Sequence, residues 1–210
     1  MTDGAAFSLT LPVNWFELDV RPSSRDLTIG LLVEAQIREQ PAFWAHRSEL
    51  TKILRRLARD AWDSGARYCA GFLIALEESI IPGSLSVSVI PAPPGGASAD
   101  AVAESLTSKE AQADGDTWSR RMIVTLPNVG RAARREGVID VTLPNDRQAT
   151  RTIIQQTFVP LLDGRVLLVS CASPALDLTD PLLELFDAVV STLALHGTAA
   201  RSDEDNGRTG

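Results

Sequence analysis

The segment TFVPLLDGRVLLVSCASP, residues 157–174, decides the expected architecture of this chain. Two apolar runs rich in β-branched residues flank Asp163–Gly164, a dipeptide typical of the tight turn of a β-hairpin. A two-residue turn at this position would place Gln156 opposite Cys171 in the paired strands. The chain therefore contains an antiparallel pair of strands near its C-terminal end, and we expect the other strands to extend that pair into a sheet.

Cys171 lies between an apolar run and a proline, and it could be a nucleophile or a core residue. A nucleophile on a strained turn needs flanking glycines, and none stands beside Cys171. A catalytic thiol also needs a base, and nothing in the sequence brings His46 or His196 near it. Alternation instead puts Cys171 on one face with Leu167 and Val169. We interpret it as a small apolar side chain of the core and keep a cysteine-dependent hydrolase as an alternative.

Alternating and helical patterns predict the remaining elements. Strands are expected within residues 7–20, 66–77, 85–90, 117–127, 137–143, 150–161 and 165–172, and helices within 24–39, 48–64, 101–108 and 180–195. The predicted fold class is α+β: an antiparallel sheet of about six strands packed on one face against N-terminal helices and a long C-terminal helix. We expect residues 1–196 to form a single α+β domain. Residues 197–210 lack large apolar side chains and are expected to be a disordered tail.

The composition limits the classes of function. The net charge is −7, and nucleic-acid-binding domains are usually basic, so no nucleic-acid partner is expected. No apolar run reaches the length of a membrane span, and the N-terminus lacks the pattern of a secretory signal. We therefore expect a cytoplasmic protein without membrane insertion. Arginine makes up 18 of the 20 basic residues, which is typical of a GC-rich bacterial coding sequence.

The cysteines, histidines and glycines give no sign of a metal or a cofactor. Two cysteines and two histidines show none of the close spacings of a zinc site. Neither of the glycine motifs that bind nucleotide phosphates occurs. We expect no catalytic residue, no metal and no cofactor. Cys69 falls on the less apolar face of its strand and should be partly exposed, and both thiols should be free.

Candidate partner-binding residues fall in two places. The connector GRAARREG, residues 130–137, contains three arginines and one glutamate, and we expect it to form a partner-facing loop. The polar face of the strand expected at residues 150–161 would hold a peptide or a partner helix, unless that face is solvated or covered by the N-terminal helices. These candidates are Arg131, Arg134 and Arg135 in the connector, and Arg151, Gln155 and Thr157 in the strand.

Arginines also recur in the helix expected at residues 48–64. They would suit a phosphate-binding patch, but Arg56 and Arg59 each have an aspartate four residues later, Asp60 and Asp63. Charges at this spacing pair along a helix, so a solvated face of paired charges is the favoured interpretation.

Two stretches resemble one known fold. LPVNWFELDV, residues 11–20, and GRVLLVSCASPALDLTDPLLELFDAVVSTLAL, residues 164–195, are similar to the first strand and to the closing strand and helix of the PsbP-like fold. The resemblance implies an α/β/α or α+β sandwich. Known members include photosystem accessory proteins, a Ran-binding nuclear import factor, small lipoproteins and bacterial secretion chaperones, and most of them act by binding other proteins. The matching positions are structural, so no site residue is carried over.

One expected function and two alternatives follow. We expect a non-enzymatic accessory or chaperone module of the bacterial cytoplasm that binds another bacterial protein, and the resemblance implies a link to secretion. The alternatives are a small cysteine-dependent hydrolase and a protein that binds an apolar ligand in a cavity between sheet and helices.

Overall fold

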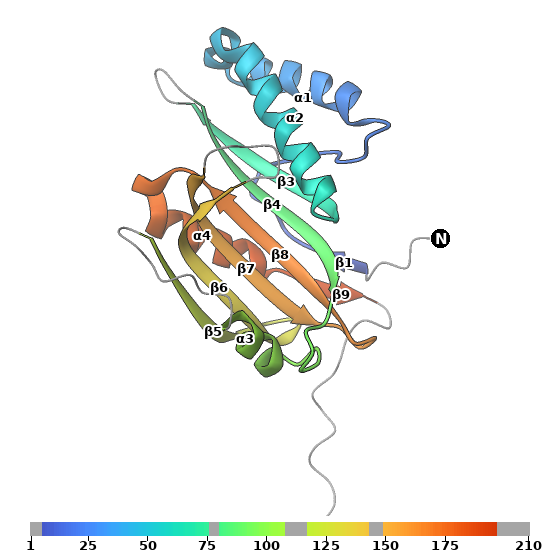
Figure 1. The fold of residues 1–210 in the computed structure, drawn as a ribbon. Coiled ribbons are helices and arrows are strands. Elements are labelled where there is room, and N and C mark those ends of the chain that lie inside the picture. The colour runs from blue at the N-terminus through green and yellow to red at the C-terminus, as the bar shows by residue number, and fades with distance from the viewer. Residues whose placement is uncertain (1–5, 76–79, 108–116, 143–148, 197–210) are drawn as a thin grey trace, which may run out of the picture.

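A seven-stranded antiparallel sheet, with the strand order β2-β3-β4-β8-β7-β6-β5, forms the centre of the protein (Figure 1). The computed structural model describes residues 6–75, 80–107, 117–142 and 149–196. The strands of the main sheet are Phe16–Glu17 (β2), Ala66–Ala75 (β3), Ile80–Pro91 (β4), Trp118–Leu126 (β5), Gly130–Val141 (β6), Thr150–Pro160 (β7) and Arg165–Ser173 (β8). A second sheet pairs β1 (Ala6–Ser8) with β9 (Ala194–His196). The α+β class and the antiparallel pairing are confirmed. The tail expected at residues 197–210 lies outside the described residues.

Helices cover both faces of the sheet. One face carries α1 (Arg25–Glu39), the 3₁₀ helix η1 (Pro41–His46) and α2 (Arg47–Asp63) at its β3 end, and α3 (Ala99–Thr107) at its β5 end. The other face packs against α4 (Thr179–Ser191), which the 3₁₀ helix η2 (Leu176–Leu178) precedes (Figure 1). The expectation that all helices share one face is therefore wrong. Apolar clusters lie on both faces of the sheet, and helices cover each of them.

The C-terminal helix is shorter than expected. α4 ends at Ser191, and residues 194–196 leave the helix to form β9. These residues pair with β1, and the backbone of Leu195 lies opposite that of Phe7. A segment as short as residues 194–196 can form either a helix or a strand. Pairing with β1, which is remote in the sequence, makes it a strand.

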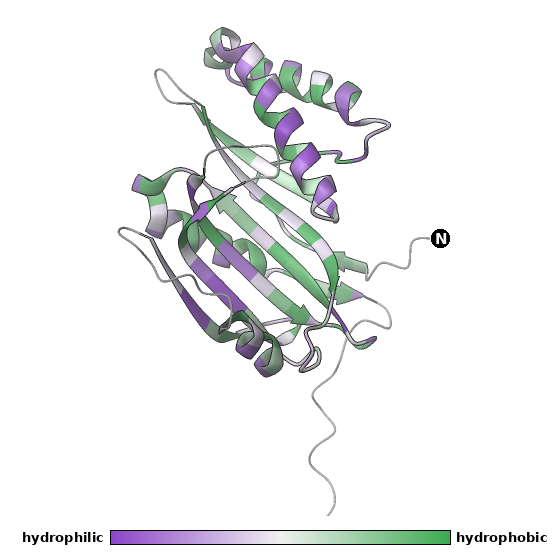
Figure 2. Ribbon diagram, in the orientation of Figure 1, coloured by the Kyte–Doolittle hydropathy of each residue, from purple (hydrophilic) through white to green (hydrophobic). Residues whose placement is uncertain are grey.

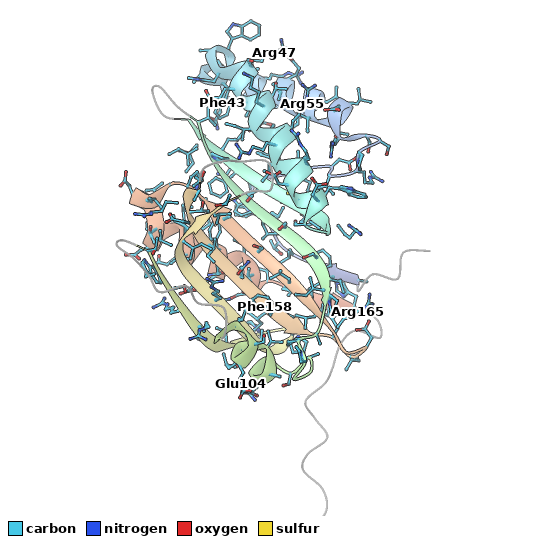
Figure 3. The ribbon with its side chains drawn as sticks, in the orientation of Figure 1. Phe43, Arg47, Arg55, Glu104, Phe158 and Arg165 are labelled. Carbon is cyan, nitrogen blue, oxygen red and sulfur yellow. The ribbon has the colours of Figure 1, made fainter. Side chains whose placement is uncertain are left out.

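Separate apolar cores lie on the two faces. Phe186 of α4 is fully buried against the sheet, in the same cluster as Cys171. The second core joins α1 and α2 to β3 and includes Phe43, Leu54 and Cys69. Hydrophobic and hydrophilic bands alternate along α2 in Figure 2, and Figure 3 labels Phe43 at the end of the molecule where α1 and α2 meet. The amphipathic pattern of α2 thus fixes which side of the helix faces the sheet.

The β7–β8 hairpin turns through three residues, one more than expected. Leu161 donates its backbone N–H to the carbonyl of Arg165 at 2.9 Å, and Gly164 closes the loop with a φ of 79°. A glycine in this left-handed conformation is common at the end of a three-residue hairpin loop. The extra residue shifts the pairing by one position, so Gln155 and not its neighbour lies opposite Cys171. Because side chains alternate between faces, the shift exchanges the face assigned to every residue of β7.

The arginine-rich segment 130–137 is a strand and not a connector. It forms most of β6, which pairs with β5 on one side and β7 on the other. Ala132 and Ala133 are fully buried there. The strand is hard to predict from the sequence, because its most buried side chains are small alanines. The arginines on either side of them are typical of a solvated loop.

Candidate functional site

A cavity of about 540 Å³ lies between α2 and the sheet face that α4 does not cover. α2 contributes Ile53 and Leu57 to its walls, and the central strands contribute Ile139, Val141 and Ile154. Pockets that bind small molecules have volumes of about 300–1,000 Å³ and mostly apolar walls. The cavity has both properties, so we take it as the candidate functional site.

α2 presents more apolar surface than its packing on the sheet uses. Leu50, Leu54 and Ala58 are fully buried in the core against β3. Ile53 and Leu57 lie beside that stripe, are only half-buried, and line the cavity. Residues three or four apart share one side of a helix, so the apolar stripe of α2 is wide enough to pack on β3 and to form a cavity wall.

A row of polar side chains crosses the cavity floor. Ser170 of β8 is paired with Gln156 of β7, and Gln156 is paired with Arg135 of β6. Paired residues of antiparallel strands point to the same side, so these three side chains form a line across the sheet. All three line the cavity. Arg121 of β5 is paired with Arg135 and continues the line toward the sheet edge.

Three charged side chains line the cavity. Arg56 and Asp60 form the expected pair on α2, with 3.7 Å between Nε and Oδ2. Burial raises the pKa of the Asp60 carboxyl, and the nearby Arg56 and Arg59 only partly offset this effect. Arg135 stands on the sheet side. Its Nε is buried and has no hydrogen-bond partner in the described part of the chain.

Arg135 is the one predicted partner-binding residue that lines the cavity. Arg131 lies at the start of β6 and forms an ion pair with Asp100 of α3, with 2.9 Å between Nη2 and Oδ1. Arg151 forms an ion pair with Asp140 on the neighbouring strand, at 3.1 Å. Arg131 and Arg151 therefore each have a carboxylate partner within the protein.

Arg134, Gln155 and Thr157 lie beneath α4 on the opposite face of the sheet. Arg134 donates its Nε–H to Oγ1 of Thr157 at 3.2 Å and forms an ion pair with Asp187 of α4. Gln155 donates its side-chain N–H to the carbonyl of Leu183 at 3.3 Å. The expectation that Gln155 and Thr157 lie on an open polar face is wrong. The one-residue shift of the hairpin turns both side chains toward α4.

Both cysteines are free and buried. Cys171 is completely buried in the core beneath α4, which confirms its interpretation as a core residue. Cys69 was expected to be partly exposed, but α1 and α2 cover it. Burial raises the pKa of the Cys69 thiol to about 12, and that of Cys171 also lies above its ordinary value. His46 lies in η1 and His196 in β9, so neither belongs to the core that holds Cys171.

Sequence reasoning missed the α2 wall and most of the polar row. The apolar positions of α2 were visible, but the sequence alone does not say which of them pack on β3 and which remain beside it. A two-residue turn at Asp163–Gly164 predicts that Gln156 lies opposite Cys171, on the buried face. Its true neighbour on β8 is Ser170, on the cavity side.

Comparison with known protein families and with curated proteins found no match for this chain. Among the residues that the structure describes, no group of histidine, cysteine and carboxylate side chains could hold a metal ion. The described helices include none that is long and apolar enough to cross a membrane.

Proposed function

We propose that the protein is a non-enzymatic binding protein that holds a ligand with an apolar body in the cavity between α2 and the sheet. The cavity itself carries this proposal: it has a volume of about 540 Å³ and walls that include Ile53, Leu57, Ile139 and Ile154. Transfer of apolar ligand surface from water to such walls is favourable, at roughly 25 cal/mol for each Å² buried. A few polar groups on the floor would orient the ligand.

The strands and the helix that form the cavity are held in place by their neighbours, which favours binding. β4, β8, β7 and β6 supply the floor, and each is paired with a strand on both sides. α2 is anchored by the fully buried Leu50 and Leu54. A preformed site loses little conformational freedom when the ligand binds, so more of the contact energy appears as affinity.

Ala172 of β8 provides the test, because it lines the cavity floor. Ala172→Phe would put an aromatic ring into the cavity, whereas the control Val13→Phe adds a ring at a fully exposed position. Binding is measured with Nile red, an uncharged dye that fluoresces in apolar surroundings, and thermal unfolding checks that each variant is folded. The wild type and Val13→Phe should bind the dye, and folded Ala172→Phe should not. Equal binding by Ala172→Phe, or none by the wild type, overturns the proposal.

Exposed apolar side chains on α1 and η1 favour a second candidate, the protein-binding role expected from the sequence. Leu27 and Leu31 lie one turn apart on α1 and are 73% and 66% exposed, and Trp44 of η1 is 67% exposed. Exposed groups of large apolar residues, and tryptophan above all, are typical of protein–protein interfaces. In this second candidate, α1 and η1 bind an apolar face of another bacterial protein.

Leu31→Glu tests the second candidate, with Gln40→Glu as a control that adds the same charge at an exposed position after α1. Proteins recovered from a bacterial lysate with the wild type should also be recovered with Gln40→Glu and lost with Leu31→Glu. A partner that all three forms recover equally does not bind through this surface.

A further inference from the structure

We infer that the ligand of the cavity is a monocarboxylic acid with an apolar chain, and that Arg135 binds its carboxylate. The inference rests on the proposed function, because it concerns the same cavity. It specifies the charged end of the ligand, which the apolar walls alone do not define.

Arg135 has the properties of a ligand-binding cation. It lies in the interior of β6, and pairing with β5 and β7 holds its backbone on both sides. Its buried Nε finds no acceptor within the described ranges of the chain. A buried donor without a partner is unfavourable, and the half-buried Arg135 side chain also carries a positive charge beside the cavity. An anion in the cavity would give Nε an acceptor and give the guanidinium a counter-ion.

The neighbours of Arg135 in the sheet do not supply that anion. Its paired residues are Gln156 on β7 and Arg121 on β5, one neutral and one positively charged. The other two arginines of β6 each have a carboxylate partner: Arg131 pairs with Asp100, and Arg134 with Asp187. Arg135 is thus the one arginine of β6 for which the described part of the chain provides no carboxylate.

The charge of the cavity lining matches a ligand with one negative charge. Two arginines and one aspartate line the cavity, and because Arg56 pairs with Asp60, one positive charge remains on Arg135. This positive charge stands out in a chain whose net charge is −7. A carboxylate carries one negative charge, whereas a phosphate monoester carries about two at neutral pH. A guanidinium also binds a carboxylate through two parallel hydrogen bonds.

The rest of the floor suits such a ligand. Gln156 and Ser170 continue the polar row from Arg135 and offer further hydrogen-bond donors to the head group. Ile139, Ile154 and the α2 wall lie around this row and can cover an aliphatic chain. The inferred ligand is therefore a small molecule with one polar end.

The test compares lauric acid with two uncharged ligands of the same chain length, lauryl alcohol and methyl laurate, by isothermal titration calorimetry below the micelle concentration of laurate and the solubility limits of the other two. The wild type should bind laurate about tenfold more tightly or better, as expected for a charge-assisted hydrogen bond. Arg135→Gln should lose this preference and still bind the alcohol. The control Arg131→Gln removes a charge from the same strand outside the cavity and should behave like the wild type.

Each outcome decides the inference. Equal affinity of the wild type for laurate and methyl laurate overturns the role of Arg135, while the proposed apolar binding stands. Failure of all three ligands, together with loss of Nile red binding, overturns the proposed function as well. Tighter binding of lauryl phosphate, or of an apolar peptide with a free C-terminus, overturns the assignment to a monocarboxylic acid. The comparison of laurate with its ester needs only the wild type, so it holds even where Arg135→Gln fails to fold.

Discussion

Gly137 stands at a point of β6 where a side chain cannot be accommodated, and Gly137→Ala should therefore weaken the β5–β6 edge of the sheet. Its φ is 152°, a conformation that residues with a side chain rarely adopt. A Cβ added there would lie 2.1 Å from the carbonyl oxygen of Trp118 and 2.7 Å from Cα of Ser119. Both atoms belong to the backbone of β5, so no side-chain rotation can relieve the contact.

The expected loss of stability has two parts. A residue with a Cβ held in a sparsely populated conformation costs about 1–3 kcal/mol, and displacing packed backbone costs about as much again. The free energy of unfolding of Gly137→Ala should therefore fall by roughly 4 kcal/mol. For a domain of this size, each kcal/mol lowers Tm by about 2–4 °C, so the expected decrease in Tm is about 8–16 °C.

Urea denaturation and thermal unfolding measure this change, with Gly30→Ala as the matched control. Gly30 is exposed on α1, and no atom lies within 4 Å of a Cβ added to it. Alanine there should raise stability by about 0.5–1 kcal/mol, because glycine is unfavourable inside a helix. A free energy of unfolding of Gly137→Ala within about 1 kcal/mol of the wild type would refute the reasoning, since an ordinary surface substitution falls in that range.

Three further predictions test the cores and the cavity. In the native protein at neutral pH, a thiol reagent such as DTNB should label Cys69 and Cys171 slowly, because burial hides both thiols and raises their pKa values; rapid labelling of either would contradict their placement. Burial raises the pKa of the Asp60 carboxyl above its ordinary 3.8, so the native state keeps the carboxyl proton to higher pH than the unfolded chain does. Binding of this proton stabilises the native state at low pH, and that stability is lost as the pH rises through the native pKa. Asn cannot ionise, so Asp60→Asn should not lose this stability. The Tm of Asp60→Asn relative to the wild type should therefore increase from acid to neutral pH, and a Tm difference that is the same at every pH would argue against the raised pKa. Phe186→Ala should lower the free energy of unfolding by about 3–5 kcal/mol in urea, since Phe186 is fully buried beneath α4, and a change near zero would show that α4 does not pack there.

Local patterns predicted most of the elements. The helix expected at residues 24–39 is observed as Arg25–Glu39, because its apolar residues recur at helical spacing and face one core. Gly65 ends α2 with a φ of 85°, as a terminating glycine should. The segment 130–137 was missed, since its character as a strand depends on two neighbouring strands and hardly on its own apolar content.

The candidate site was predictable only in part. Arg135 was identified as an arginine with little local compensation, and the structure shows that it lacks a described partner. The expectation of a partner-facing loop is wrong, because Arg135 lies in a strand beside a cavity. Ile53 and Leu57 could not be assigned to the cavity from the sequence. An apolar residue at the edge of a helical stripe gives the same sequence pattern whether its side chain packs in the core or lines a cavity.

The sequence by itself determined which segments alternate and which are amphipathic, and hence most of the strands and helices and the core position of Cys171. These properties are local, because the spacing of apolar residues depends only on the geometry of the element that carries them. The tertiary structure decided the register of β7 on β8 and, with it, which polar residues reach the cavity. An Asp-Gly turn fits a loop of two or three residues, and the choice depends on how the completed strands pack beneath α4. That single residue turned Gln155 and Thr157 into the core and left Gln156 beside Arg135 on the cavity side of the sheet.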